Sequence, residues 1–131
     1  MTKNELSQLY WLGREIKEQQ RRLAELESLA TSCTSLITGM PHGRGVDNRL
    51  AEYVAEIADL RDQINLNLRK CFYELNRLTN YVSGIEDSQI RQIISLRHIN
   101  GLSWVRIAFA LGGDSTADGV RMAYKRYLEK T

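Results

Sequence analysis

The side chains best suited to bind an anionic ligand gather near the C-terminal end of the chain. Arg121 and Lys125 are four residues apart, so they lie on one face if this segment is an α-helix. Guanidinium and ammonium groups donate hydrogen bonds to phosphate oxygens and to the polar edges of nucleic-acid bases. The residues that we expect to contact such a ligand are Arg106, Ser115, Thr116, Ala117, Asp118, Arg121, Met122 and Lys125.

A helix over residues 116–129 would position most of these side chains. Its apolar residues form a single stripe, which consists of Val120, Tyr124, Tyr127 and Leu128. We expect this stripe to face the preceding helix, so that the basic side chains face outward. The polar run 114–116 offers several oxygens that can cap its first turn.

A shorter helix precedes it. Ser103 is a candidate N-cap, and either Gly112 or Gly113 supplies the left-handed residue that ends such a helix. Its apolar stripe consists of Trp104, Ile107, Ala108 and Leu111. Two helices joined by a tight turn are typical of a helix-turn-helix, whose second helix lies in the major groove of DNA. In that arrangement Arg106 would reach the DNA backbone.

A third helix comes before this pair. Asp87 can cap a helix that runs through Ile90, Ile93, Ile94 and Arg97 and stops at Asn100-Gly101. A helical hairpin with a basic end does not by itself indicate DNA binding, because basic residues also stabilise the C-terminal end of a helix through its dipole. Three helices with a tight turn before the last one form a more specific pattern than the hairpin alone, and this pattern favours a DNA-binding module.

The run LRHINGLSWVRIAFALGGDSTADGVRMAYKRYL resembles region four of bacterial sigma factors, the part that reads the −35 promoter element. The shared features are the LS start, the IA pair, the LG stop and the spacing from Ser115 to Val120. Together with a coiled N-terminal half and the ITGMP sequence at Ile37 to Pro41, the chain is similar to small phage and prophage proteins. These are sigma-like or ArpU-like late transcription regulators. The resemblance implies double-stranded DNA and RNA polymerase as partners, in the cytoplasm and nucleoid of a bacterial cell.

The chain departs from the region-four pattern at two points. Val105-Arg106 stands where the family usually has an acidic pair before the IA. Gly119 lies inside the expected recognition helix, where glycine costs about 1 kcal/mol relative to alanine. It either permits a close approach to the DNA backbone or marks the weak start of the helix.

Composition sets the outer limits. The 131 residues can make one domain, or a small domain with an extension. Hydrophobic residues make up 43% of the chain and charged residues 26%, a composition that excludes a disordered chain. No apolar run reaches the length of a membrane span and no secretory signal precedes the first helix, so we expect a cytoplasmic protein without a membrane partner. The net charge of +2 resides in residues 85–131, which carry 7 basic and 5 acidic residues.

The pattern of the N-terminal half predicts a long helical hairpin. A first helix is expected from about Lys3 to Leu36, a glycine-rich turn over residues 38–45, and a second helix capped by Asp47 or Asn48. The first heptad seam consists of Leu9, Ile16, Leu23, Ala30 and Ile37, with the companion series Leu12, Gln19, Leu26 and Cys33. The second consists of Leu50, Ile57, Ile64, Cys71, Leu78 and Ile85, with the companion series Val54, Arg61, Leu68, Leu75 and Val82.

Such a hairpin would leave apolar residues exposed off its seam. They include Leu6, Tyr10, Trp11, Leu29, Phe72 and Tyr73. Exposed apolar patches commonly mark a partner site, so we expect the hairpin to form a homodimer or to dock against the C-terminal helices or polymerase. The expected fold is therefore all-α, with an antiparallel coiled-coil hairpin over 1–84 and a three-helix helix-turn-helix domain over 85–131.

Chemistry-bearing clusters of other kinds are missing from the sequence. The spacing of Cys33 and Cys71 from each other and from the histidines matches no zinc-binding motif. We interpret both cysteines as small buried apolar residues. No catalytic triad, carboxylate pair or phosphate loop is recognisable. We therefore expect no enzyme, no catalytic residue, no metal and no cofactor.

Three functions fit this pattern. The first is a sequence-specific DNA-binding transcription regulator of phage or prophage type. The second is a DNA-recognition subunit of a phage packaging machine (small terminase-like), which also couples a helix-turn-helix to a coiled coil. The third is an interaction protein whose helix-turn-helix does not bind DNA.

Overall fold

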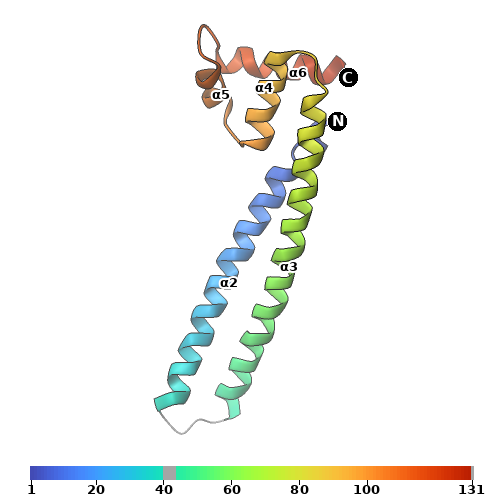
Figure 1. Cartoon of the computed structure of the whole chain (residues 1–131). Helices are drawn as coiled ribbons and strands as arrows, with labels where there is room; N and C mark the ends of the chain where they lie inside the picture. The colour runs from blue at the N-terminus through green and yellow to red at the C-terminus, as the bar shows by residue number, and fades with distance from the viewer. Residues whose placement is uncertain (40–43, 131) are drawn as a thin grey trace. The chain divides into compact units, whose positions relative to one another are not determined.

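The computed structural model describes residues 1–39 and 44–130, with side chains described for 1–33 and 48–130. All of its elements are helical, which confirms the all-α prediction (Figure 1). In chain order they are α1 (Lys3–Leu6), α2 (Gln8–Gly39), α3 (Arg44–Ser83), α4 (Ser88–Ile94), the π-helix η1 (Ser95–Ile99), α5 (Trp104–Leu111) and α6 (Ala117–Lys130).

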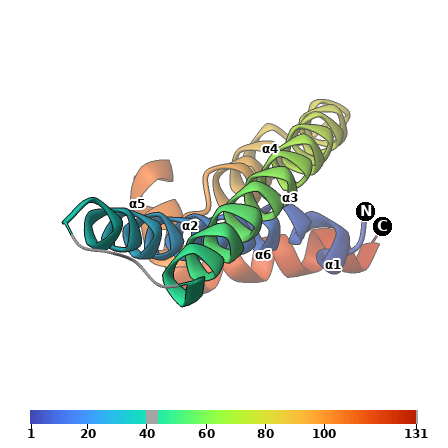
Figure 2. The ribbon, with the colours of Figure 1, turned by 90° about the horizontal axis from the view of Figure 1, so that it is seen from below.

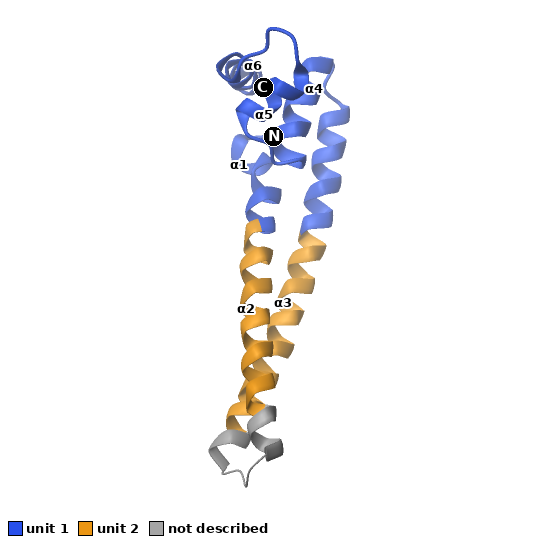
Figure 3. Ribbon diagram, turned by 90° about the vertical axis from the view of Figure 1, so that its left-hand side faces the viewer, with its two compact units in different colours: residues 1–13, 71–131 blue, residues 14–70 orange. Residues whose placement is uncertain are grey.

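The chain forms two compact units (Figure 3). Unit 1 consists of Met1–Gly13 and Cys71–Thr131, and unit 2 consists of Arg14–Lys70. This grouping differs from the expected division into 1–84 and 85–131. The reason is burial: Leu6 and Leu78 are fully buried in the same apolar cluster as the C-terminal helices. An apolar side chain belongs to the unit that removes it from water, wherever it lies in the sequence.

The core of unit 1 is one apolar cluster. Its buried members are Leu6, Leu78, Ile85, Ile90, Ile93, Ile94, Ile107, Ala108, Val120 and Tyr124. Two of the expected caps position the helices that supply them. The Asp87 carboxylate accepts from the Gln89 and Ile90 amides at the start of α4, and Ser103 Oγ accepts from the Arg106 amide at the start of α5. Both cap predictions are confirmed.

The N-terminal helix α1 has its own cap at its start. Thr2 and Glu5 form a reciprocal capping box, in which each side chain accepts from the other residue's backbone N–H. Ser7 then interrupts the helical path, and its Oγ donates to the Lys3 carbonyl at 2.9 Å. The single helix that we expected from about Lys3 is therefore divided at Ser7.

Unit 2 consists of the facing segments of α2 and α3, which run antiparallel. The first seam is confirmed, since Ile16, Leu26 and Cys33 are buried and its other described members in this unit are partly buried. In α3 the series through Ile57 and Ile64 is also buried.

The companion series expected in α3 is wrong within this unit. Val54 is 54% exposed and Leu68 is 40% exposed, and Arg61 also faces water. The inward positions lie one residue earlier, at Tyr53, Leu60 and Asn67. A heptad stripe accepts companions three or four residues after each seam residue, and only the partner helix decides which of the two is covered.

A polar contact lies inside this seam. The Asn67 amide donates to Gln19 Oε1 at 3.0 Å, and Asn67 is buried. Gln19 is the polar member of the companion series in α2, and the structure gives it a partner in α3. Burying an amide pair is tolerated when both groups are hydrogen-bonded, and such a pair favours one register over others.

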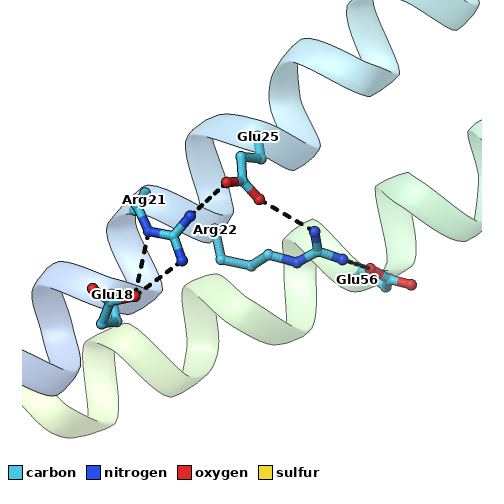
Figure 4. A network of polar contacts seen from close by, with 5 residues as sticks. All are labelled: Glu18, Arg21, Arg22, Glu25 and Glu56. Atoms are coloured by element: carbon cyan, nitrogen blue, oxygen red, sulfur yellow. Dashed lines mark hydrogen bonds and ion pairs between the residues drawn. The ribbon is translucent and has the colours of Figure 1, made fainter.

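Exposed ion pairs surround the seam. Arg21 bonds Glu18 and Glu25 along α2, and Arg22 contacts Glu25 and, across the hairpin, Glu56 at 3.7 Å (Figure 4). These side chains are about half exposed or more, so each pair contributes little to stability.

The expected turn over 38–45 is shorter in the structure. α2 extends to Gly39 and α3 begins at Arg44, so the ends of that range are helical. The cap expected at Asp47 or Asn48 is wrong, because both residues lie inside α3. Residues 40–43 lie outside the described part of the chain, as do the side chains of Ile37 and the rest of 34–47.

Candidate nucleic-acid interface

The turn between α5 and α6 depends on glycine. α5 ends at Gly112, which has φ 73° and ψ −169°, and Gly113 follows with φ 63°. Positive φ values are accessible to glycine and costly for other residues, so both glycines are needed here. The Gly112 amide also donates to the Ala108 carbonyl at 3.1 Å, which closes the last turn of α5.

Thr116 begins the next helix. Its Oγ1 accepts from the Gly119 amide at 3.0 Å, which is the geometry of an N-cap, and α6 follows from Ala117. A Cβ on residue 119 would lie 2.9 Å from that hydroxyl. Gly119 therefore leaves room for the cap. The sequence left two interpretations of Gly119, a close approach to the DNA backbone or the weak start of the helix. The cap geometry explains the glycine by its place at the start of the helix, and no DNA contact is needed to explain it.

The inward side of α6 is fixed by packing. Val120 and Tyr124 are each 4% exposed, and Tyr127 and Leu128 are partly buried, which confirms the expected stripe. The Tyr124 ring lies 5.0 Å from the Trp104 ring of α5, centroid to centroid. Because one whole side of α6 is anchored in the core, the helix can present its other side as a rigid surface.

The outward side carries most of the predicted contact residues. Exposed there or beside it are Arg106, Thr116, Asp118, Arg121, Met122 and Lys125, whereas Ser115 and Ala117 are only partly exposed. Arg121 is half exposed and lies 3.9 Å from Asp118, one turn earlier. Thr116 has its hydroxyl engaged in the helix cap, so it acts first as a structural residue.

One residue of this surface was missed. Arg126 is exposed four residues after Met122, and its Nε donates to the Met122 carbonyl at 3.4 Å. The spacing was visible in the sequence, because positions four apart share a helix face. Arg126 therefore belongs with Arg121 and Lys125 to the basic surface of α6.

A π-helical turn positions two further groups beside α6. The Arg97 guanidinium lies 4.4 Å above the Trp104 ring and donates to the Leu102 carbonyl at 3.0 Å. His98 is buried, and its Nε2 forms a 2.8 Å hydrogen bond with Tyr124 Oη. π-Helical turns are rare and occur frequently at functional sites.

The environment of His98 keeps its ring neutral. Burial lowers the pKa of His98 to about 4, and the positive charge of Arg97 acts in the same direction. A backbone hydrogen bond with Leu6 opposes these effects, and the charge of Lys3 adds to them. His98 thus contacts both α6 and the N-terminal segment as an uncharged group.

A hollow of about 400 Å³ lies along the edge of α6. Its lining includes Arg121 and Lys125 from α6, Arg97 from η1 and Lys3 from α1. Figure 2 shows α1 beside the C-terminal part of α6. Lys3 was not among the predicted residues. No local pattern could have found it, because it is brought there by the burial of Leu6.

Comparison of the chain with protein-family models, curated proteins and solved structures finds no match. Among the described residues, no three His, Cys, Asp or Glu side chains gather in a way that could hold a metal ion. None of the helices that the structure describes has both the length and the apolar character needed to cross a membrane. Both cysteines are free thiols.

Proposed function

We propose that the protein is a sequence-specific DNA-binding regulator of transcription, with α6 as its recognition helix. The observation that supports this most is the division of α6 into two sides. Val120 and Tyr124 anchor it in the core, while Arg121, Met122 and Lys125 face solvent. An α-helix fits the major groove of B-DNA, provided that its outer side is open.

The chemistry of the outward side suits a duplex. Arg121 can donate two hydrogen bonds to the O6 and N7 of a guanine, and Met122 can contact a thymine methyl group. Lys125 and Arg126 can bind phosphates, which positions the helix without reading sequence. The basic excess of the region is small, so one copy of the chain should bind weakly and with a marked dependence on salt.

A second copy or polymerase would supply the remaining affinity. Several large apolar side chains are exposed on the parts of α2 and α3 that belong to unit 1, among them Trp11, Phe72 and Tyr73. They offer a surface for the homodimer and for the polymerase contact that the region-four resemblance implies. In this proposal α2 and α3 bind a protein partner, while α6 binds DNA.

One observation favours the alternative of an interaction protein. Phe109 is 90% exposed and Val105 is 69% exposed, and they lie one turn apart on α5. Two large apolar side chains on one exposed helix face are typical of a protein contact. If this face is the main binding surface, α6 contributes only to the fold.

Selection of bound fragments from random duplex DNA, followed by affinity measurements, tests the proposal. Arg121→Ala should weaken binding to the selected duplex roughly 5- to 150-fold, because a bidentate base contact contributes about 1–3 kcal/mol. Arg69→Ala is the matched control, since Arg69 is an exposed arginine in unit 2. If the wild-type chain binds no duplex at low salt, or if both variants bind equally well, the proposal is wrong. Loss of a protein complex in Phe109→Ser would then favour the alternative.

A further inference from the structure

The hollow beside α6 is lined by side chains from four separate elements. Lys3 and Ser7 come from α1 and its C-cap, Arg97 comes from η1, and Arg121 and Lys125 come from α6. Trp104 of α5, with His98, Tyr124, Leu128 and Glu129, completes the lining. All of these residues belong to unit 1, whose single apolar core holds the elements together.

The charges around the hollow are strongly unequal. Four cationic side chains line it, those of Lys3, Arg97, Arg121 and Lys125, against the single carboxylate of Glu129. Of the ion pairs that the structure describes, none includes Lys3 or Lys125. Arg121 is paired with the exposed Asp118 at 3.9 Å, so the cations of the hollow are only partly compensated. Clustered cations repel one another, and an anion bound among them relieves that repulsion.

Part of this lining is held in place before any ligand binds. Arg97 is fixed by its stacking on Trp104 and by its bond to the Leu102 carbonyl. Lys3 lies in a helix that is capped at Thr2 and anchored by the fully buried Leu6. A site whose groups are already positioned loses less conformational entropy when it binds its ligand.

We propose that this hollow binds a phosphate group of the DNA backbone, so that the N-terminal helix α1 forms part of the DNA interface. The inference rests on the proposed function, because the same α6 side chains border both the hollow and the outward side. Phosphate carries the negative charge and the acceptor oxygens that a lysine and arginine cluster recognises. The phosphate would be contacted by Lys3 from α1 and by Lys125 from α6, which leaves Arg121 at the border of the hollow to contact a base.

Duplex binding by the full chain tests this assignment. Lys3→Ala should weaken binding to the selected duplex and to an unrelated duplex by the same factor, since a phosphate contact carries no sequence information. It should also reduce the slope of log K against log salt concentration by about 0.9, the value for one phosphate contact. Lys3→Arg, which retains the charge, should restore the slope.

Lys130→Ala is the matched control. Lys130 is an exposed lysine of α6 that does not line the hollow, and its loss removes the same net charge. It should leave the salt slope close to that of the wild-type chain. Circular dichroism and thermal unfolding of each variant establish that the fold is intact, and the capping box at Thr2 and Glu5 does not involve the Lys3 side chain.

Three outcomes would overturn the assignment. If the wild-type chain binds duplex DNA and Lys3→Ala has the same salt slope as Lys130→Ala, the hollow is not a backbone contact. If no duplex is bound, this inference and the proposed function both fail. A third arm uses Trp11→Phe, which leaves Trp104 as the remaining tryptophan of two. Saturable quenching of Trp104 by inorganic phosphate, with an unchanged DNA slope in Lys3→Ala, would assign the hollow to a free phosphorylated ligand instead.

Discussion

The two compact units bury their apolar residues in different geometries. In unit 2 the buried apolar residues form a line along two helices, consisting of Ile16, Leu26, Cys33, Ile57 and Ile64. In unit 1 they form a closed cluster to which α1, α3, α4, α5 and α6 all contribute. A residue in a line has neighbours on one side and solvent close by on the other, whereas a residue in the cluster is enclosed.

This difference shows where the molecule is rigid. Enclosed residues cannot be removed without leaving a cavity, whereas a seam between two helices can partly collapse. The surface bonds that accompany the seam, such as Arg61 with Glu27, are exposed and contribute little. The candidate DNA interface therefore lies on the unit whose packing fixes side chains most firmly.

The largest expected effect comes from the same substitution in both units. Leu6→Ala and Leu26→Ala remove equivalent side chains, which are 0% and 1% exposed. Substitutions of this kind cost about 2–5 kcal/mol, and the cost increases with the cavity that remains. We expect Leu6→Ala to lie near the upper end and Leu26→Ala near the lower end, as measured by urea unfolding.

A larger loss for Leu26→Ala would contradict the comparison, since it would place the more enclosed site in the hairpin. Leu6→Ala should also weaken DNA binding under conditions where the chain stays folded, because it loosens α1 beside α6. Leu26→Ala should leave DNA binding by folded protein unchanged.

Next comes a pair of glycines whose substitution should have opposite effects. Gly112→Ala should destabilise the protein by about 1–3 kcal/mol, because φ 73° with ψ −169° is strained for alanine. Gly13→Ala should stabilise it by up to about 1 kcal/mol, because Gly13 lies inside α2 with nothing within 4 Å of an added Cβ. Thermal unfolding of both variants measures the difference. An unchanged or raised stability in Gly112→Ala would show that the turn does not require its glycine, and a loss in Gly13→Ala would contradict the expectation for α2.

A pH effect should follow from His98. Its pKa is lowered to about 4 in the folded chain, chiefly by burial, while the unfolded chain keeps a value near 6.5. Between these values the unfolded chain binds a proton that the folded chain does not, so stability falls as pH decreases from about 6.5 to about 4. His98→Gln should show a shallower fall in urea unfolding across this range. An identical pH dependence would mean that His98 is not held neutral by the fold.

The smallest expected effect belongs to the surface of unit 2. Arg21 bonds Glu18 and Glu25, but its side chain is 63% exposed. Arg21→Ala should leave the urea midpoint within the error of the wild-type value, and added salt should not widen the difference. A clear, salt-sensitive loss would show that the network in Figure 4 stabilises the hairpin more than exposed pairs usually do.

Local features of the chain could be predicted because they depend on near neighbours. The caps at Asp87 and Ser103 were predicted correctly, as was the left-handed glycine after α5. Each is a contact between residues a few positions apart, so the sequence contains both partners. The inward stripe of α6 was predicted for the same reason, because a helix places residues three and four apart on one side.

Features that depend on distant residues could not be predicted. In unit 2 the companion series of α3 was displaced by one position, because the residues of α2 decide which neighbouring position is covered. The pairing of Gln19 with Asn67 has the same origin.

By itself, the sequence determined that the chain is helical, where its last helices begin and end, and which side of α6 faces the core. These are properties of short stretches, governed by backbone hydrogen bonding and helical periodicity. Only the tertiary structure decided that Lys3 and Lys125 line one hollow and that His98 contacts Tyr124. Burial of Leu6 brings the two ends of the chain together, and the gain from enclosing an apolar side chain depends on the whole cluster around it.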